Sequence, residues 1–502
     1  MDETSRVAPE RTATPPRAGR LVRGMAWMAV LRWSAQLVSW SATLIVARVL
    51  TPGDYGLAGM AMIYATLAAI AIDCGLASVV VSYGELRDEA IRQLHAVALS
   101  LGIVGAIATV AAAPLVARFF GHQEIIALLQ LVAVTILSDA SRTVPVARLS
   151  KSLRYRDVAT VDMIKSVAGS GVVLASALAG MREWSLPLGL CAGSLAATAY
   201  TYVRFALRPA APARAVLRGP MTFGVQNWVA RFAWYAYSNA GFWIVGRLLG
   251  PAALGQYNLA WTIASLPGDK LVTIITGAAD PFFAAIRSDQ HGLRSYLLRL
   301  TEAITLIVLL PLLGLLLVAD LAIPLVLGEQ WRDAVTPLRF LVLYHGINAP
   351  LLLTGSLNVI TGGVRFGMIV TSLIAVVLSA GQIVGAKALG VSGVAAAWPL
   401  LYPALMLFTV RRVLRATDTP WRSYLSAWRP ATVASTGMAV AVLAVRALAH
   451  WGTWPRVVEL ASAVTAGAVV GIAVALRGES FIVQQIVEKV MARLPRRAAP
   501  SI

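Results

Sequence analysis

Basic side chains within apolar segments are the residues of this chain best suited to do chemistry. Four of them lie inside runs that are otherwise long and apolar enough to cross a membrane: Arg32, Lys165, Arg231 and Lys270. A basic residue at the centre of a membrane helix costs about 2.5–3.5 kcal/mol on insertion scales, so each needs water, an acidic partner or an anionic ligand. Arginine also presents a planar fork of donors that suits phosphate. The pattern predicts a cationic, water-filled site that binds an anionic head group.

Acidic residues lie in the same half of the predicted membrane region. They are Asp73, Asp139, Asp162 and Asp269. Asp73 and Asp139 are our candidates for coupling to a proton or a sodium ion, because carboxylates within membrane spans mark ion pathways. The alternative is that the charges pair internally, for example Asp162 with Lys165 at i,i+3. We therefore expect either an ion-coupled binding site or a set of structural ion pairs.

Aromatic and amide side chains crowd the first and seventh apolar runs. Trp33, Asn227 and Trp234 are candidate sugar-binding residues, because binding pockets combine apolar faces with a few polar groups. Trp228 and Tyr235 belong to the same group. The alternative is that these rings only pack against neighbouring helices or anchor the protein at the membrane interface.

Composition places the chain in the polytopic membrane class. Of its 502 residues, 58% are hydrophobic and only 13% are charged, whereas a soluble domain carries roughly 25% charged residues. The net charge of +19 lies mostly between the apolar runs, which favours the positive-inside rule over nucleic-acid binding. Cys74 and Cys191 both lie in apolar runs, so we expect no disulfide framework and no metal site.

Fourteen membrane spans are predicted from the apolar runs. They cover residues 24–48, 56–82, 94–117, 124–141, 157–180, 184–203, 222–246, 254–280, 298–319, 334–361, 366–386, 393–410, 430–445 and 457–476. Placing both termini in the cytoplasm puts most Lys and Arg residues on cytoplasmic segments. With this orientation Arg32, Lys165 and Arg231 all lie about eight residues, or roughly 12 Å, from the cytoplasmic ends of their spans.

The predicted organisation is an all-α polytopic membrane protein with two parallel six-helix bundles and a C-terminal helix pair. Its parts are a disordered basic cytoplasmic tail (1–23), an N-terminal six-helix bundle (24–207), a basic cytoplasmic linker (208–221), a C-terminal six-helix bundle (222–415), helices 13 and 14 (416–477) and an amphipathic basic cytoplasmic tail (478–502). No loop exceeds roughly 20 residues, which leaves no room for a catalytic domain outside the membrane.

One short sequence occurs twice, once in each predicted bundle. Ile45–Gly56 reads IVARVLTPGDYG and Ile244–Gly255 reads IVGRLLGPAALG, and at the same offset Arg32 aligns with Arg231. Proline and glycine suit a tight turn where one helix ends and the next begins. Six spans per repeat is an even number, so both halves have the same orientation and the binding site is expected between them.

Three segments carry a resemblance to a known family. They are ARVLTPGDYGLAGMA from Ala47, AIDCGL from Ala71 and LVLGEQWRDAVTPLRFL from Leu325. Over about residues 24–415 the chain resembles the oligosaccharide (Wzx-type) flippases of the multidrug/oligosaccharidyl-lipid/polysaccharide exporter superfamily. One departure is that the second copy of the repeated turn lacks the Asp54–Tyr55 pair, which argues against a role shared by both copies.

The resemblance implies a specific activity. It implies that an undecaprenyl-pyrophosphate-linked oligosaccharide repeat unit is moved across the bacterial inner membrane by alternating access, for O-antigen, capsule or exopolysaccharide synthesis. Implied partners are the lipid-linked oligosaccharide, membrane lipids, and the polymerase and glycosyltransferases of the same pathway; no cofactor is implied.

Two alternatives within the same superfamily stay open. A lipid II-type peptidoglycan precursor flippase would share the cationic cavity, whereas a multidrug exporter favours acidic spans for its cationic compounds. An enzyme is not expected, because the chain has neither an HExxH nor a P-loop motif and no large exposed loop. A purely structural scaffold would leave the repeated intramembrane arginines unexplained.

Overall fold

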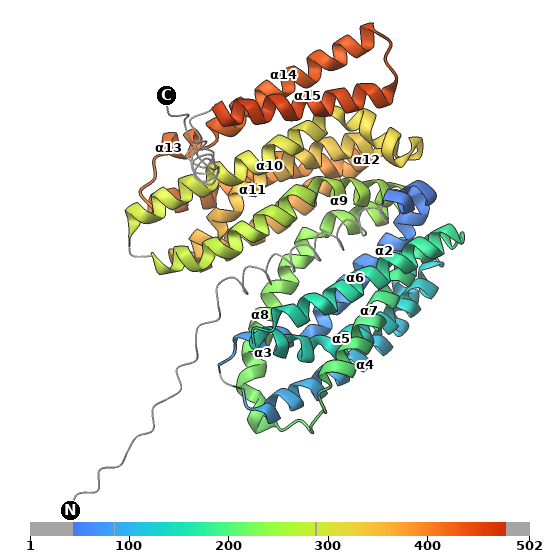
Figure 1. Cartoon of the computed structure of the whole chain (residues 1–502). Helices are drawn as coiled ribbons and strands as arrows, with labels where there is room; N and C mark the ends of the chain where they lie inside the picture. Colours follow the sequence, from blue (N-terminus) through green and yellow to red (C-terminus); the bar gives the residue numbers. More distant parts are fainter. Residues whose placement is uncertain (1–43, 85, 287–288, 478–502) are drawn as a thin grey trace, which may run out of the picture.

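The computed structural model describes residues 44–84, 86–286 and 289–477, and all regular elements within these ranges are helices (Figure 1). From Pro52 onward, the α-helices include α2 (Pro52–Asp73), α3 (Leu76–Ser82), α4 (Asp88–Phe120), α5 (Ile125–Lys151), α6 (Tyr155–Leu178), α7 (Ser185–Phe205) and α8 (Arg214–Ser238). The others are α9 (Ala240–Ala285), α10 (Gln290–Leu327), α11 (Val335–Ile360), α12 (Val364–Ala416), α13 (Trp421–Ser426), α14 (Arg429–Trp451) and α15 (Arg456–Arg477). Two short 3₁₀ helices, η1 (Arg182–Trp184) and η2 (Glu329–Ala334), precede α7 and α11.

Ten helices of the described part are long and apolar enough to cross a membrane. One of them, α12, bends at Gly390 (φ 60°, ψ −139°) and so contains both predicted spans 366–386 and 393–410. Helix α9 bends in the same way at Gly250 (φ 85°, ψ −178°), inside the second copy of the repeated sequence. Only glycine adopts such backbone angles without strain. The prediction of an all-α polytopic membrane protein is confirmed.

The predicted single span 56–82 is in fact two helices. The chain turns at Cys74 and Gly75, both with left-handed φ angles of 44° and 72°, and α3 begins after this turn. A Cβ on Gly75 would lie 2.2 Å from the main-chain oxygen of Gly224 on α8. Gly75 therefore lies where α8 approaches the first bundle closely, and only glycine fits at this position.

The helices form two bundles and an additional pair. Helices α2–α7 make up the first bundle and α9–α12 the second, and α8 leads from one to the other while packing mainly on α2 and α3 (Figure 1). Helices α14 and α15 pack on each other and on α10, outside the second bundle (Figure 1). This is the predicted arrangement of two bundles followed by a helix pair.

Four charged residues tie the helix pair to the second bundle. Asp320 of α10 accepts from Arg446 of α14 at 2.6 Å and from Arg339 of α11 at 2.7 Å. Arg446 also reaches Glu459 of α15 at 3.3 Å. The network joins four helices, so these charges have structural partners within the fold.

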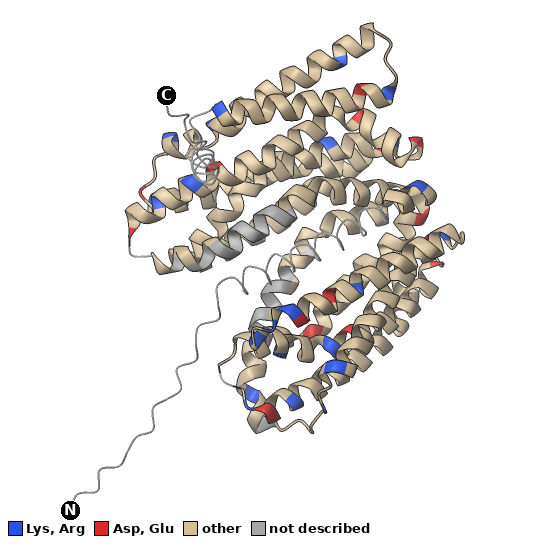
Figure 2. Cartoon of the chain, viewed as in Figure 1, with Lys and Arg blue, Asp and Glu red and all other residues tan. Residues whose placement is uncertain are grey.

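The two ends of the molecule differ in chemistry. At one end, which we call the turn end, the two copies of the repeated turn (residues 50–56 and 249–255) meet where α2 packs along α9. Lys and Arg gather at the opposite, basic end, where α4 and α10 begin (Figure 2). A polarised charge distribution of this kind is what orients a membrane protein.

Candidate functional site

Close packing of α6 and α7 positions the candidate site. A Cβ on Gly193 of α7 would lie 2.5 Å from the main-chain oxygen of Lys165, and one on Gly189 would lie 2.7 Å from another main-chain oxygen of α6. Small residues at helix interfaces let membrane helices touch backbone to backbone. Ser194 follows directly in the sequence and donates a hydrogen bond to Asp139 of α5. Three helices thus meet at one carboxylate.

Asp139 is the centre of a cluster of charges within the first bundle. Its carboxylate accepts hydrogen bonds from Lys165 Nζ at 3.2 and 3.3 Å. It also accepts from Arg142 Nε at 3.0 Å and Arg142 Nη2 at 2.9 Å. The alternative partner for Lys165 on its own helix was Asp162, but Lys165 donates to Asp139 on α5. The charged side chain is therefore held across helices.

The triad of Asp139, Lys165 and Arg142 carries more positive than negative charge, and Asp162 lies nearby on the helix of Lys165. One carboxylate, that of Asp139, faces two cations, Lys165 and Arg142, so these three side chains together are cationic. They are not sealed off: 29% of Asp139, 28% of Lys165 and 15% of Arg142 side-chain surface is exposed. A partly exposed cationic group within a bundle attracts anions more strongly than it would in water, because the surrounding dielectric constant is lower.

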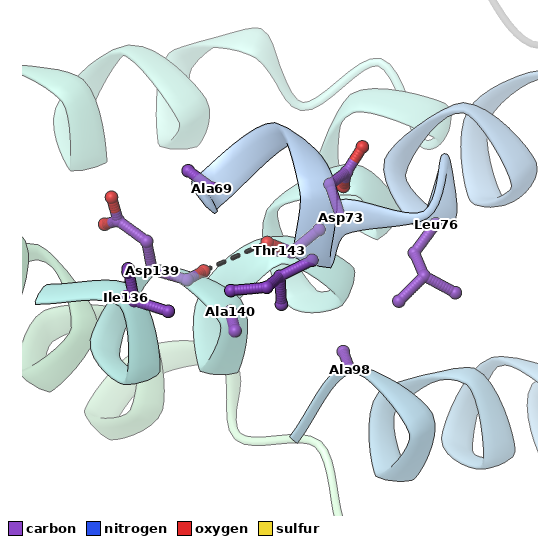
Figure 3. Close-up of a pocket in the computed structure, with 9 residues that line it drawn as sticks. Ala69, Asp73, Leu76, Ala98, Ile136, Asp139, Ala140 and Thr143 are labelled. Carbon is purple, nitrogen blue, oxygen red and sulfur yellow. Dashed lines mark hydrogen bonds between the residues drawn. The ribbon is translucent and has the colours of Figure 1, made fainter. Parts of the chain in front are cut away.

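Asp139 lines a pocket of about 80 Å³ together with Asp73 (Figure 3). The other lining residues are Ala69, Ile72, Leu76, Ala98, Ile136, Ala140 and Thr143. Thr143 Oγ1 donates to the main-chain oxygen of Asp139 at 2.9 Å, and the two carboxylates do not point toward each other (Figure 3). Both candidates for ion coupling therefore share one small pocket.

Lys165 lines a second, larger pocket of about 340 Å³. Its other lining residues are Val46, Tyr55, Met62, Ser166, Gly169, Ser170, Val173, Leu186, Gly189, Leu190 and Gly193. Small-molecule sites usually have this composition, a mostly apolar wall with a few polar groups. The salt bridge between Asp139 and Lys165 connects a wall residue of the smaller pocket to a wall residue of the larger one.

The other predicted site residues fall partly outside the described structure. Arg32 and Trp33 lie outside the described residues. Asn227 and Arg231 belong to α8 and Lys270 to α9, but their side chains lie outside the described part. Trp234 of α8 is described, and 58% of its surface is exposed. Of the predicted site residues, Lys165 and Asp139 form a salt bridge, and Asp73 and Asp139 line one pocket. The pairing of Arg32 with Arg231 stays a prediction.

Two aromatic residues of the seventh apolar run have packing roles. Trp228 Nε1 donates to the main-chain oxygen of Ile70 at 2.6 Å, and Tyr235 donates to that of Ile63 at 3.1 Å. Both bonds run from α8 to α2. Membrane helices use such polar contacts between neighbours, so these two rings hold α8 on the first bundle.

Sequence reasoning missed two members of the cluster. Arg142 lies three residues after Asp139 on the same helix. This spacing favours an ion pair, so the pair could have been predicted from the sequence. Ser194 gave no signal, because a serine in an apolar run reveals its partner only when the helices are packed.

The fold is similar to that of two solved membrane transporters. The lipid II flippase MurJ, solved in an inward closed conformation, superposes with a TM-score of 0.68 at 13% identity, covering 93% of this chain and 100% of that one. An inward-facing multidrug transporter of the multidrug/oligosaccharidyl-lipid/polysaccharide exporter superfamily gives a TM-score of 0.61 at 17% identity, covering 78% of this chain and 99% of the other.

The sequence places the chain more narrowly. A family model described as polysaccharide biosynthesis protein matches residues 45–336, and the chain belongs to this family. The chain is 25% identical to the succinoglycan biosynthesis transport protein ExoT of Rhizobium meliloti over 96% of its length and 98% of the relative's. It is 24% identical to the lipopolysaccharide biosynthesis protein WzxC of Escherichia coli, over 64% and 66% of the two chains. The resemblance drawn from the sequence motifs is confirmed.

Proposed function

We propose that this protein moves an undecaprenyl-pyrophosphate-linked oligosaccharide repeat unit across the bacterial inner membrane for polysaccharide synthesis. Its family and its full-length similarity to a succinoglycan transport protein support a transport role in such a pathway. The observation that carries the substrate class is the cationic cluster beside a pocket of about 340 Å³ within the first bundle. Cations in a partly apolar pocket suit a phosphate-bearing head group.

Alternating access is the proposed mechanism. The turn end faces the outside and the basic end, with both termini, faces the cytoplasm, in line with the positive-inside rule. The lipid tail stays in the bilayer while the head group passes between the bundles. Rocking of one bundle against the other exposes the site to each side in turn, as in other transporters built from parallel repeats.

Binding residues divide by the part of the substrate that they hold. Arg32, Arg231, Lys165 and Lys270 bind the pyrophosphate, and Trp33, Asn227 and Trp234 contact the sugars. Lys165 supports this role by its geometry. Its ammonium has three donors, and one of them remains for a phosphate oxygen when two are directed at the two oxygens of Asp139.

Ion coupling is assigned to Asp73 and Asp139. Protonation of Asp139, or binding of a sodium ion beside it, would weaken its hold on Lys165 and Arg142. The cluster would then present more positive charge to the larger pocket. A cation taken up in the smaller pocket would thereby change anion affinity in the larger one.

Binding of undecaprenyl pyrophosphate to the purified protein, followed by native mass spectrometry, tests the proposed substrate. Wild type is compared with the Arg32→Ala, Arg231→Ala double variant, and Arg→Lys changes at both positions serve as the charge-preserving control. We expect saturable binding that the alanine variant loses and the lysine variant largely keeps. Equal binding by all three would remove the arginines from the site, and tighter binding of lipid II would favour a peptidoglycan precursor instead.

A further inference from the structure

The two copies of the repeated turn contact each other reciprocally. A Cβ on Gly56 would lie 1.7 Å from the main-chain oxygen of Pro251 in the second copy. A Cβ on Gly255 would lie 2.0 Å from the main-chain oxygen of Pro52 in the first. These positions correspond in the repeat, so the contact has approximate two-fold symmetry. Glycine is required at both, because the backbones of the two bundles touch there.

Next to this contact, the end of each bundle is capped by side chains of the other. The helical turns before Pro52 end in carbonyl groups that have no partner within their own helix. Gln330 Nε2, from η2 of the second bundle, donates to the main-chain oxygens of Ala47, Arg48 and Leu50 at 3.2, 3.3 and 3.0 Å. Trp331 Nε1 donates to that of Ala47 at 2.7 Å, with its side chain fully buried.

The reverse contact is made by Arg48. Its Nε donates to the main-chain oxygen of Val326 at 2.7 Å and its Nη2 to that of Leu325 at 2.6 Å. Both oxygens belong to the last turn of α10, where a cation also complements the helix dipole. Each bundle therefore supplies donors to a helix C-terminus of the other.

The same residues form the sequence segments that carry the family resemblance. Arg48 belongs to ARVLTPGDYGLAGMA and the other two donors to LVLGEQWRDAVTPLRFL. Tyr55, also from the first segment, packs its ring edge-on against Trp331 at 5.6 Å between centroids. Two segments about 280 residues apart in the chain thus meet in one interface. Tyr55 of the first segment also lines the larger pocket together with Lys165, so this interface adjoins the candidate site.

We infer that Arg48, Gln330 and Trp331 form a latch that holds the turn end closed and opens in each transport cycle. The inference rests on the proposed alternating access. The latch consists mainly of hydrogen bonds to helix-end carbonyls, which water can replace when the bundles separate, so closure is reversible. The substrate site can then open at the turn end only after these bonds break.

Cysteine accessibility tests the latch without any substrate. In a background with Cys74→Ser and Cys191→Ser, Leu50→Cys places one thiol under the latch, at a position that is 1% exposed. Cells that produce the full chain are treated from outside with a membrane-impermeant maleimide. The Gln330→Ala, Trp331→Phe variant removes four hydrogen bonds of the latch. We expect it to raise the labelling rate at least about tenfold, the factor that the loss of one or two of them would already give.

A matched control separates the latch from general loosening. Gln256→Ala removes an amide at the same end of the molecule, but its bond at 3.4 Å goes to Asp333 within the second bundle. We expect this variant to label like the parent. Equal rates in the latch variant and Gln256→Ala would overturn the latch. Arg48→Ala, labelled in parallel, tests the reverse contact and should also label faster than the parent. Thermal unfolding of each purified variant identifies those that are misfolded.

Flipping activity of the same variants distinguishes the two proposals. Faster labelling combined with altered flipping supports a latch in the transport cycle. Faster labelling with unchanged flipping would overturn the requirement that the latch open during transport, while the substrate assignment would still stand. If the wild-type protein does not bind undecaprenyl pyrophosphate, the proposed function is contradicted. The labelling result would still show whether the latch closes the turn end.

Discussion

Lys165 shows how a cation inside a membrane bundle can be stabilised and still remain available to a ligand. Two oxygens of Asp139 offset the cost of burying its ammonium group, while its side chain keeps 28% of its surface exposed. Arg142 shares the same carboxylate, so the local charge is not fully neutralised. The side chain is thus held in place at the wall of a pocket large enough for a phosphate group.

Lys165→Ala should weaken the binding of undecaprenyl pyrophosphate by about tenfold to a hundredfold, the effect of losing one charge-assisted hydrogen bond. Lys165→Arg should restore most of the affinity. The matched control is Lys387→Ala, which removes the same charge from an exposed position on α12. Native mass spectrometry at graded lipid concentrations measures the affinities. An equal loss in the Lys387 variant would show that only net charge matters.

Asp139→Asn should lower the free energy of unfolding by about 1–3 kcal/mol, because Lys165 and Arg142 lose their shared ionic partner. Adding Lys165→Met should recover part of the loss, since one uncompensated cation is removed. Thermal unfolding in detergent, arranged as a double-mutant cycle, measures the coupling between the two residues. Additive effects would contradict the salt bridge.

At the residue scale the sequence placed Lys165 within an apolar helix but did not identify its partner. Asp162 is the nearest acidic residue to Lys165 along its helix, yet the bond comes from Asp139, 26 residues away. The choice depends on the packing of α5 against α6 and α7, where Gly193 allows close approach. Such tertiary contacts leave no local pattern in an apolar run.

Helix α2 and the second part of α9 are the elements that bring the bundles together. They start at corresponding turns, and their glycines allow the backbones to touch. The N-terminus of α2 is fixed by a capping box, in which Thr51 and Asp54 exchange hydrogen bonds of 3.1 and 3.2 Å. Because this turn is fixed and the two backbones touch at glycines, a larger side chain at those glycines should disturb the packing of the turn end.

Gly56→Ala should force the bundles apart at the turn end, because the added methyl group would lie 1.7 Å from the main-chain oxygen of Pro251. We expect a maleimide to label Leu50→Cys faster in this variant and transport to fall. Gly53→Ala is the matched control: it lies in the same first turn of α2, where a Cβ would meet only Thr51 Oγ1 at 3.8 Å. Similar behaviour of the two variants would argue against a close backbone contact.

At the element scale the apolar runs predicted the helices well, because length and hydropathy decide what can span a membrane. Proline and glycine in the repeated sequence correctly indicated a helix end followed by a helix start. The break between α2 and α3 was missed, because Cys74–Gly75 interrupts neither hydropathy nor length. At this break Gly75 lies against Gly224 of α8, a contact with another helix that the sequence does not reveal.

The whole molecule combines a closed turn end, a basic end and a cationic site in one of two similar bundles. The internal repeat predicted the pair of bundles, since an even number of spans preserves orientation. The repeat could not predict the hydrogen bonds between the bundles at the turn end. Gln330 and Trp331 lie outside the repeated sequence, and their acceptors belong to the other bundle.

Flipping of a fluorescent undecaprenyl-pyrophosphate-linked oligosaccharide in proteoliposomes tests directly whether this protein transports that lipid. Lipid exposed to a membrane-impermeant quencher is measured over time for wild type, Lys165→Ala and protein-free vesicles. We expect rapid exchange with wild type, strongly slowed exchange with Lys165→Ala and almost none without protein. Exchange with wild type no faster than in protein-free vesicles, or selective flipping of lipid II, would contradict the proposed function.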